Sequence, residues 1–144
     1  MNKNIKNSLV KIIFIVSVLI FFDLLKKMIF LFLFSVVSVY AYEELNISNF
    51  EDKIKGKNVI VDFYAPWCPP CKIIAGNLED FSTKKPKNVE VYKVNVDDEL
   101  NLAKKYGVAA LPTLVYFKDG KVKKNYVGVL STEELLEASK ENFK

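Results

Sequence analysis

Histidine and arginine are both absent from this chain of 144 residues, and cysteine occurs only twice. Two cysteines without histidine cannot supply the ligand set of a structural zinc site. A c-type haem needs a histidine directly after its Cys-x-x-Cys pair, and Lys72 stands there instead. An iron–sulfur cluster needs about four thiolates, which only a dimer of this chain could share. The composition therefore predicts no metal site and no bound cofactor.

Clustered positive charge is missing beyond the N-terminal region. Five lysines and one aspartate precede Tyr42, and the remaining 16 lysines are balanced by 16 acidic residues. The net charge of +4 therefore belongs to the N-terminal segment, and the rest of the chain is neutral. Proteins that bind nucleic acids through phosphate contacts carry a clustered basic surface. We therefore expect no nucleic-acid partner.

Two apolar runs, residues 9–22 and 28–41, flank a short charged segment. Each is shorter than the roughly 18 to 20 apolar residues of a membrane-spanning helix. The second run follows two lysines and ends in VYA, whose small first and last residues resemble a signal-peptide cleavage site. We predict that residues 1–41 are a signal peptide cleaved after Ala41, with a retained membrane anchor as the alternative. Residues 42–144 form the second predicted domain.

The N-terminal segment also decides the compartment of the domain. One crossing places it in the periplasm or another extracytoplasmic space, whereas two crossings would return it to the cytoplasm. Because the apolar runs are too short for two full spans, we expect the extracytoplasmic location. Met28 is an alternative start, but initiation there would remove the lysines that precede the second run.

After residue 42 the chain alternates between helix and strand patterns. Strands are expected at about 58–65, 87–98, 112–117 and 121–128, and Asp119-Gly120 predicts a hairpin turn between the last two. Helices are expected at about 48–55, directly after the cysteines, at about 99–106, and from Ser131 onward. In the helix after the cysteines, the apolar residues expected to face inward are Ile73, Ile74, Leu78 and Phe81. Ser48 and Ser131 each begin a Ser-x-x-Glu capping box. This order predicts an α/β fold with a mixed sheet and helices on both faces.

Both cysteines lie in the stretch YAPWCPPCK, residues 64–72. Pro69 and Pro70 suit the first turn of a helix, so Cys68 is expected at the helix N-cap. Free backbone N–H groups and the helix dipole stabilise a thiolate there. Cys71 lies one turn inside and is expected to be more shielded, so Cys68 is the predicted nucleophile and Cys71 the resolving thiol of a redox-active disulfide. A purely structural disulfide is the alternative, although closing so small a loop removes little chain entropy.

The segment VDFYAPWCPPCK, with ALPT at residues 110–113 and Val127-Gly128, resembles the thioredoxin family over about residues 43 to 144. The resemblance implies a central mixed sheet flanked by helices on both faces, and thiol–disulfide exchange as the activity. It also implies that Asp62 is a buried acid that takes the proton of Cys71, and that Lys93 lies near this acid.

The resemblance assigns a substrate surface as well. Trp67 would flank the nucleophile and form part of this surface. Pro112 matches a cis proline, a conformation almost confined to proline, which would leave the backbone of Leu111 free to pair with an extended substrate. Gly128 would keep the other side of the groove open.

Three positions depart from the family pattern. Pro69-Pro70 stands where cytoplasmic thioredoxins usually carry Gly-Pro, and this dipeptide tunes the thiol pKa and the potential. Gly76 replaces a helix-kinking proline, and Tyr64 stands where tryptophan is common. The first departure leaves the direction of electron flow open.

These features predict an exported thiol–disulfide oxidoreductase. We favour the reductase direction because a buried acid such as Asp62 is typical of reducing members of the family. The substrates would be disulfide-containing periplasmic proteins, with apocytochromes among the candidates. The electrons would come from a membrane or thioredoxin-reductase-like donor, since no nicotinamide or flavin site is apparent. The alternatives are a disulfide oxidase or isomerase of the same fold, and a non-redox module that holds unfolded chains.

Overall fold

The computed structural model describes residues 3–35 and 42–144, which fall into two separate units. The first unit is α1 (Lys3–Ser35), a single helix that continues through the charged segment between the two apolar runs. The cleavage site predicted at Ala41 lies outside the described residues.

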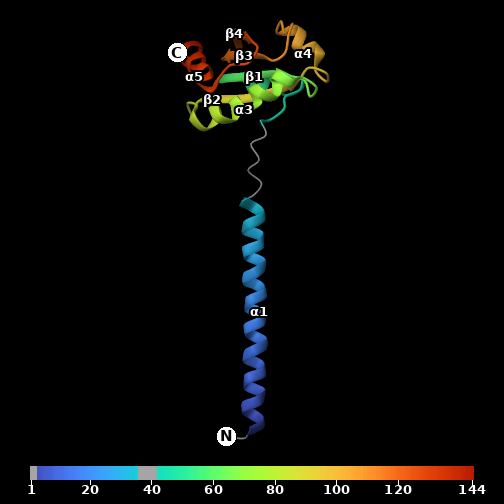
Figure 1. The fold of residues 1–144 in the computed structure, drawn as a ribbon, viewed down its shortest axis with the longest axis vertical. Helices are drawn as coiled ribbons and strands as arrows, with labels where there is room; N and C mark the ends of the chain where they lie inside the picture. The colour runs from blue at the N-terminus through green and yellow to red at the C-terminus, as the bar shows by residue number, and fades with distance from the viewer. Residues whose placement is uncertain (1–2, 36–41) are drawn as a thin grey trace. The chain divides into compact units, whose positions relative to one another are not determined.

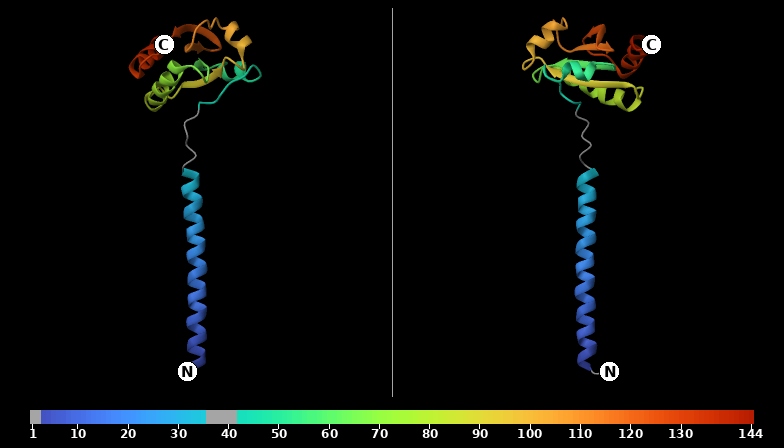
Figure 2. Two further views of the ribbon diagram at one scale, coloured as in Figure 1. Left: turned by 45° about the vertical axis from the view of Figure 1, so that its right-hand side comes forward. Right: turned by 180° about the vertical axis from the view of Figure 1, so that it is seen from behind.

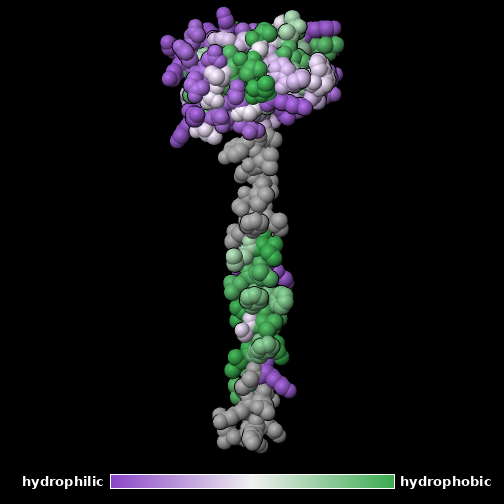
Figure 3. Space-filling model, viewed as in Figure 1, coloured by the Kyte–Doolittle hydropathy of each residue, from purple (hydrophilic) through white to green (hydrophobic). Residues whose placement is uncertain are grey.

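Apolar side chains cover most of the described surface of α1 (Figure 3). Phe14 and Met28, for example, are 70% and 68% exposed. Over the part of the chain that the structure describes, no helix combines the length and the apolar character needed to cross a membrane.

A four-stranded mixed sheet forms the centre of the second unit (Figure 1). Its strands are β1 (Asn58–Tyr64), β2 (Val89–Asn95), β3 (Thr113–Lys118) and β4 (Lys121–Val127). They lie in the order β2-β1-β3-β4, with β1 parallel to β2 and antiparallel to β3, and with β3 antiparallel to β4. The predicted mixed sheet is confirmed.

Two helices cover each face of this sheet (Figures 1 and 2). The first pair is α2 (Phe50–Ile54) and α4 (Leu100–Lys105), and the second is α3 (Pro69–Lys84) and α5 (Thr132–Asn142). Val61 and Phe63 of β1 pack with the first pair, whereas Ile60 packs with the second. Successive side chains of a strand point to opposite faces, which explains why almost all of β1 is apolar.

The inward face of α3 follows the helical repeat of 3.6 residues. Ile74, Leu78 and Phe81 are fully buried and share this face with Cys71. Ile73, which the sequence pattern also placed inward, is 59% exposed. That prediction is wrong because the position directly before Ile74 lies about 100° around the helix from it.

The hairpin between β3 and β4 has the predicted turn. Asp119 and Gly120 both have positive φ, at 53° and 75°. Two consecutive positive φ values are the requirement of the type I′ turn that suits a tight hairpin.

The capping box predicted at Ser131 is present at the start of α5. The Ser131 hydroxyl accepts a hydrogen bond from the N–H of Glu134, and the Glu134 carboxylate accepts one from the N–H of Ser131 at 2.7 Å. Two of the backbone donors that a helix start leaves unpaired are thereby satisfied.

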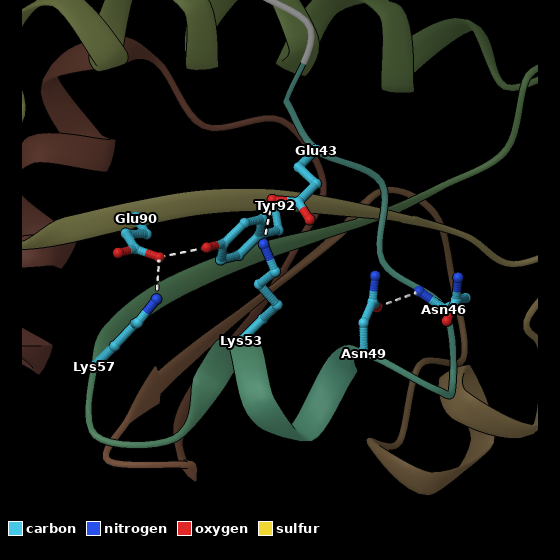
Figure 4. A network of polar contacts seen from close by, with 7 residues as sticks. All are labelled: Glu43, Asn46, Asn49, Lys53, Lys57, Glu90 and Tyr92. Carbon is cyan, nitrogen blue, oxygen red and sulfur yellow. Dashed lines mark hydrogen bonds and ion pairs between the residues drawn. The ribbon is translucent and has the colours of Figure 1, made fainter.

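The capping box predicted at Ser48 is not formed, and α2 begins only at Phe50. Two asparagines organise this turn instead. The Ser48 hydroxyl donates to Asn46 Oδ1 at 2.5 Å. The N–H of Asn46 donates to Asn49 Oδ1 at 2.9 Å (Figure 4). Asparagine side chains compete for such local hydrogen bonds, so the serine caps nothing.

The segment before α2 lies along the outer edge of β2. The N–H of Leu45 donates to the carbonyl of Lys93 at 2.8 Å, and the N–H of Lys93 donates to the carbonyl of Glu43 at 3.2 Å. Lys53 of α2 pairs with the Glu43 carboxylate at 2.6 Å (Figure 4). These contacts extend the sheet by a short parallel bridge between Glu44 and Lys93.

Candidate active site

Cys68 and Cys71 form a disulfide with their Cα atoms 5.3 Å apart. Cys68 is the N-cap of α3, and Pro69 and Pro70 occupy the first helical positions, as predicted. The backbone N–H of Cys71 donates a hydrogen bond to Cys68 Sγ at 3.3 Å. A donor from the first turn of the helix therefore faces the sulfur of Cys68.

The predicted difference in exposure between the two cysteines is wrong in this oxidised form, because each is 3% exposed. The disulfide ties the sulfur of Cys68 to Cys71, which lies on the buried face of α3. Both pack with Ala65, and Tyr64 and Leu111 lie against this cluster. What distinguishes the two is that Cys68 lines a surface groove and Cys71 does not.

This groove has a volume of about 440 Å³ and is mostly apolar. Residues 67–70 and 108–111 line it together with Val96, Leu100 and Ala103. Sequence reasoning found Trp67 and Leu111 but missed the last three residues. Their only signal was apolar character at the end of β2 and in α4, which core packing would explain equally well.

Trp67 lies on the surface next to Cys68, as the resemblance implied, with 68% of it exposed. Its indole Nε1–H donates a hydrogen bond to Asp97 Oδ2 at 3.0 Å. Asp97, which sequence reasoning also missed, follows the end of β2 by two residues. The hydrogen bond fixes the tryptophan ring beside the groove.

The Leu111–Pro112 peptide bond is cis, as the resemblance implied. Within residues 42–144, the backbone N–H and carbonyl of Leu111 form no hydrogen bond with another backbone group. Gly128 lies beside this bond and donates its N–H to the carbonyl of Pro112 at 2.8 Å. Its φ of +96° favours glycine, and an added Cβ would meet no atom within 4 Å, so this position is open.

Asp62 is the buried acid of the site, with 5% of it exposed. It shares with Ile60 the face of β1 that is covered by α3, the helix that carries Cys71. Its Oδ1 atom has no hydrogen-bond partner among the described residues. Burial removes water from the carboxylate and raises its pKa to about 7, although the charge of Lys93 opposes this. Asp62 can therefore gain or lose a proton near neutral pH.

Lys93 is the register partner of Asp62 on β2, so the structure brings these two predicted residues together. Its ammonium group is nevertheless paired with Glu44, at 3.3 Å, and lies 5.2 Å from the centre of the Tyr64 ring. Among the described residues, Asp62 forms no ion pair. Sequence reasoning missed Glu44, because a single bridge beside β2 leaves no strand pattern to recognise.

A family model described as "Thioredoxin" matches residues 41–141. The chain is 40% identical over 97 residues to a thioredoxin of Staphylococcus epidermidis, covering 67% of this chain and 93% of that protein. It is 39% identical over 92 residues to a thioredoxin of Alicyclobacillus acidocaldarius, covering 63% of this chain and 88% of the relative.

A plant relative and a solved structure extend this comparison. The chain is 33% identical over 102 residues to the chloroplastic M-type thioredoxin of Pisum sativum, covering 69% of this chain and 59% of the pea protein. The crystal structure of Malassezia sympodialis thioredoxin superposes with a TM-score of 0.64 at 32% identity, covering 72% of this chain and 92% of the other.

Proposed function

The chain belongs to the thioredoxin family of disulfide oxidoreductases, and we propose that it works outside the cytoplasm as a reductase of protein disulfides. The observation that carries the reductase direction is Asp62, a buried carboxyl group on the sheet face beneath α3 that has no ion-pair partner among residues 3–35 and 42–144. Reduction of a substrate requires the proton of Cys71 to be removed, and a buried acid that titrates near neutral pH is suited to accept it.

The first step is attack by Cys68. The Cys68 thiolate is stabilised by the N-terminus of α3 and by the N–H of Cys71. It attacks one sulfur of the substrate disulfide, and a new bond forms between Cys68 and the substrate. The other substrate sulfur leaves with the bonding electrons as a thiolate, which takes a proton from water.

The second step resolves this mixed disulfide. Asp62 accepts the proton of Cys71, and the resulting thiolate attacks the sulfur of Cys68. The Cys68–Cys71 disulfide forms while the second substrate sulfur leaves as a thiolate. Two electrons have then passed from the dithiol to the substrate, and the chain is left in the oxidised form that the structure describes.

The surroundings of Cys68 suit a protein substrate. The apolar groove beside Trp67 can take an apolar side chain next to the substrate disulfide. The unpaired N–H and carbonyl of Leu111 can pair with an extended backbone, as an added strand does at a sheet edge. The substrate is therefore proposed to be an extended or unfolded segment that carries a disulfide.

Single cysteine variants test this mechanism. We expect Cys68→Ser to abolish reduction of a protein disulfide such as that of insulin, because Cys68 is the one thiol among the described residues that line the groove. Cys71→Ser should retain the first attack and accumulate a mixed disulfide that is visible on a non-reducing gel. Full activity of Cys68→Ser would overturn the mechanism. Retained activity of a variant without both cysteines would instead favour the non-redox binding module.

Export is supported by the distribution of charge and apolar residues before Tyr42, where the whole net charge of +4 resides. We expect a reporter that works only in the cytoplasm to be inactive when it is fused after Lys144. A matched fusion without residues 1–41 should be active. N-terminal sequencing of the mature protein would then locate the cleavage, which we propose follows Ala41. An active full-length fusion would contradict the proposed location.

A further inference from the structure

Three charged side chains form a row across the sheet beneath α3. Glu44 is the bridge partner of Lys93, and Lys93 is the register partner of Asp62. Paired residues of neighbouring strands point to the same face. The row runs from the exposed Glu44 through the half-buried Lys93 to the buried Asp62. One ammonium group therefore has a carboxyl group on either side.

The ammonium group is held at the outer end of this row. Lys93 Nζ lies 3.3 Å from Glu44 Oε2 and 5.2 Å from the centre of the Tyr64 ring. The Tyr64 hydroxyl donates to the same Glu44 oxygen at 2.8 Å, which fixes the carboxylate in turn. The inner carboxyl group, that of Asp62, has one oxygen without a hydrogen-bond partner in the part of the chain that the structure describes.

We propose that Glu44 is a positioning residue, which holds the ammonium group of Lys93 at the sheet edge and so prevents an ion pair between Lys93 and Asp62. Such a pair would favour the carboxylate and lower the pKa of Asp62, making it a weaker base. Without the pair, desolvation dominates and Asp62 titrates near neutral pH. The consequence for catalysis rests on the proposed function, in which Asp62 accepts the proton of Cys71.

Among the described residues, few charges other than that of Lys93 act on Asp62. Tyr42 and Tyr64 lie close enough for the charge of Asp62 to raise their pKa values, which burial raises further, so both are neutral at pH 7. Its register partner on β3 is the apolar Leu114. On α3, Cys71 lies on the buried face and is bound in the disulfide in the oxidised form, whereas the carboxylates of Glu79 and Asp80 are exposed.

The test is the pKa of Asp62 in the oxidised full chain, followed by NMR of its side-chain carboxyl carbon against pH. We expect Glu44→Gln to lower this pKa by about one pH unit, because the released ammonium group can approach Asp62. Lys93→Met should raise it. In the Lys93→Met background, Glu44→Gln should have little further effect. This cycle separates release of the ammonium group from direct repulsion between the two carboxylates.

A matched control exists on the opposite face of the sheet. Glu51 pairs with Lys105 at 2.5 Å and accepts from the Tyr106 hydroxyl at 3.0 Å, and Lys105 Nζ lies 5.2 Å from the centre of the Tyr106 ring. Glu51→Gln therefore breaks an equivalent contact on another face and should leave the pKa of Asp62 unchanged.

A second variant reports on the same contact. Tyr64→Phe removes one hydrogen bond to Glu44 and should lower the pKa of Asp62 by less than Glu44→Gln does. The pH at half-maximal rate of mixed-disulfide resolution should shift downward with the pKa in both variants.

Two results would overturn the role of Glu44. One is an Asp62 pKa that is unchanged or raised in Glu44→Gln. The other is a fall of the Asp62 pKa on Glu44→Gln that is equally large in the native chain and in the Lys93→Met background. If the titrations follow the expectation but the chain reduces no disulfide, the proposed function fails while the positioning role stands.

Discussion

At the scale of single residues, the site contains a carboxyl group at a buried position of a strand, where a charge is energetically unfavourable. Asp62 lies among fully buried neighbours on β1, and one of its oxygens has no hydrogen-bond partner among the residues that the structure describes. Burying a charge without a partner is costly, and a buried acid responds by holding its proton to a higher pH. Under the proposed function, the property that lets Asp62 accept the proton of Cys71 should therefore also reduce the stability of the fold.

This cost gives a prediction for Asp62→Asn. The pKa of Asp62 is about 7 in the folded chain against 3.8 for the free side chain. Between these values the folded state keeps a proton that the unfolded state has lost, so stability falls as pH rises from about 4 to about 7. At about 1.4 kcal/mol per pKa unit, the full loss is about 4 kcal/mol. Asparagine does not ionise, so the variant should lack this loss.

The measurement is urea unfolding of the full chain between pH 4 and pH 9. As pH rises, the free energy of unfolding of Asp62→Asn should increase relative to that of the native chain. Any loss of stability from burying the asparagine amide does not depend on pH and leaves this trend unchanged. Asp80→Asn, at an exposed position of α3, is the control and should follow the native profile. Parallel profiles for the native chain and Asp62→Asn would show that Asp62 is ionised throughout.

At the scale of elements, the same capping motif has different outcomes at its two occurrences. Ser131→Ala should lower the free energy of unfolding by about 1 kcal/mol, because it removes the N-cap acceptor of α5. Ser48→Ala should change it by much less, because Ser48 is hydrogen-bonded to Asn46 and caps no helix. Urea midpoints of the two variants provide the comparison. Equal losses would mean that Ser48 stabilises the start of α2 despite its geometry.

These elements also show what the sequence could and could not predict about the fold. Patterns were reliable where every local preference agreed, as in the apolar β1 and the Asp119-Gly120 turn. The prediction at Ser48 was wrong because two nearby asparagines offered competing hydrogen bonds. Ile73 was wrongly placed inward because its neighbour Ile74 already occupies the buried face of α3.

For the candidate active site too, some features could be predicted from the sequence and others could not. Cys68 at the helix N-cap and the cis bond before Pro112 could be inferred from motifs, because each depends on neighbours in sequence or on a specific resemblance. The equal burial of the two cysteines and the pairing of Glu44 with Lys93 could not. Both depend on which parts of the chain meet in the folded domain.

At the scale of the whole molecule, the chain can store two electrons but has no predicted means of obtaining them alone. Cys68 and Cys71 are its only cysteines, and Cys68 is the one that lines the groove. Under the proposed function, an electron donor must reduce the disulfide through the same groove that receives substrates. Electron donor and substrate would therefore compete for the surface around Trp67. An excess of substrate should slow reduction of the chain by the donor, and an excess of donor should slow binding of the substrate.

The direction of electron flow is decided by the reduction potential of the whole chain. We expect a value near the −270 mV or so typical of thioredoxins, because the buried Asp62 matches reducing members of the family. The measurement is equilibration of the full chain with thiol buffers, followed by fluorescence of Trp67, the single tryptophan and the neighbour of Cys68. A variant without both cysteines has no thiol to oxidise and should show no such transition. A potential near −120 mV, typical of strong disulfide oxidants, would contradict the reductase proposal. Such a potential would identify the chain as an oxidase, in which electrons pass from substrate thiols to the Cys68–Cys71 disulfide. The Pro69-Pro70 dipeptide would then be the feature that raises the potential.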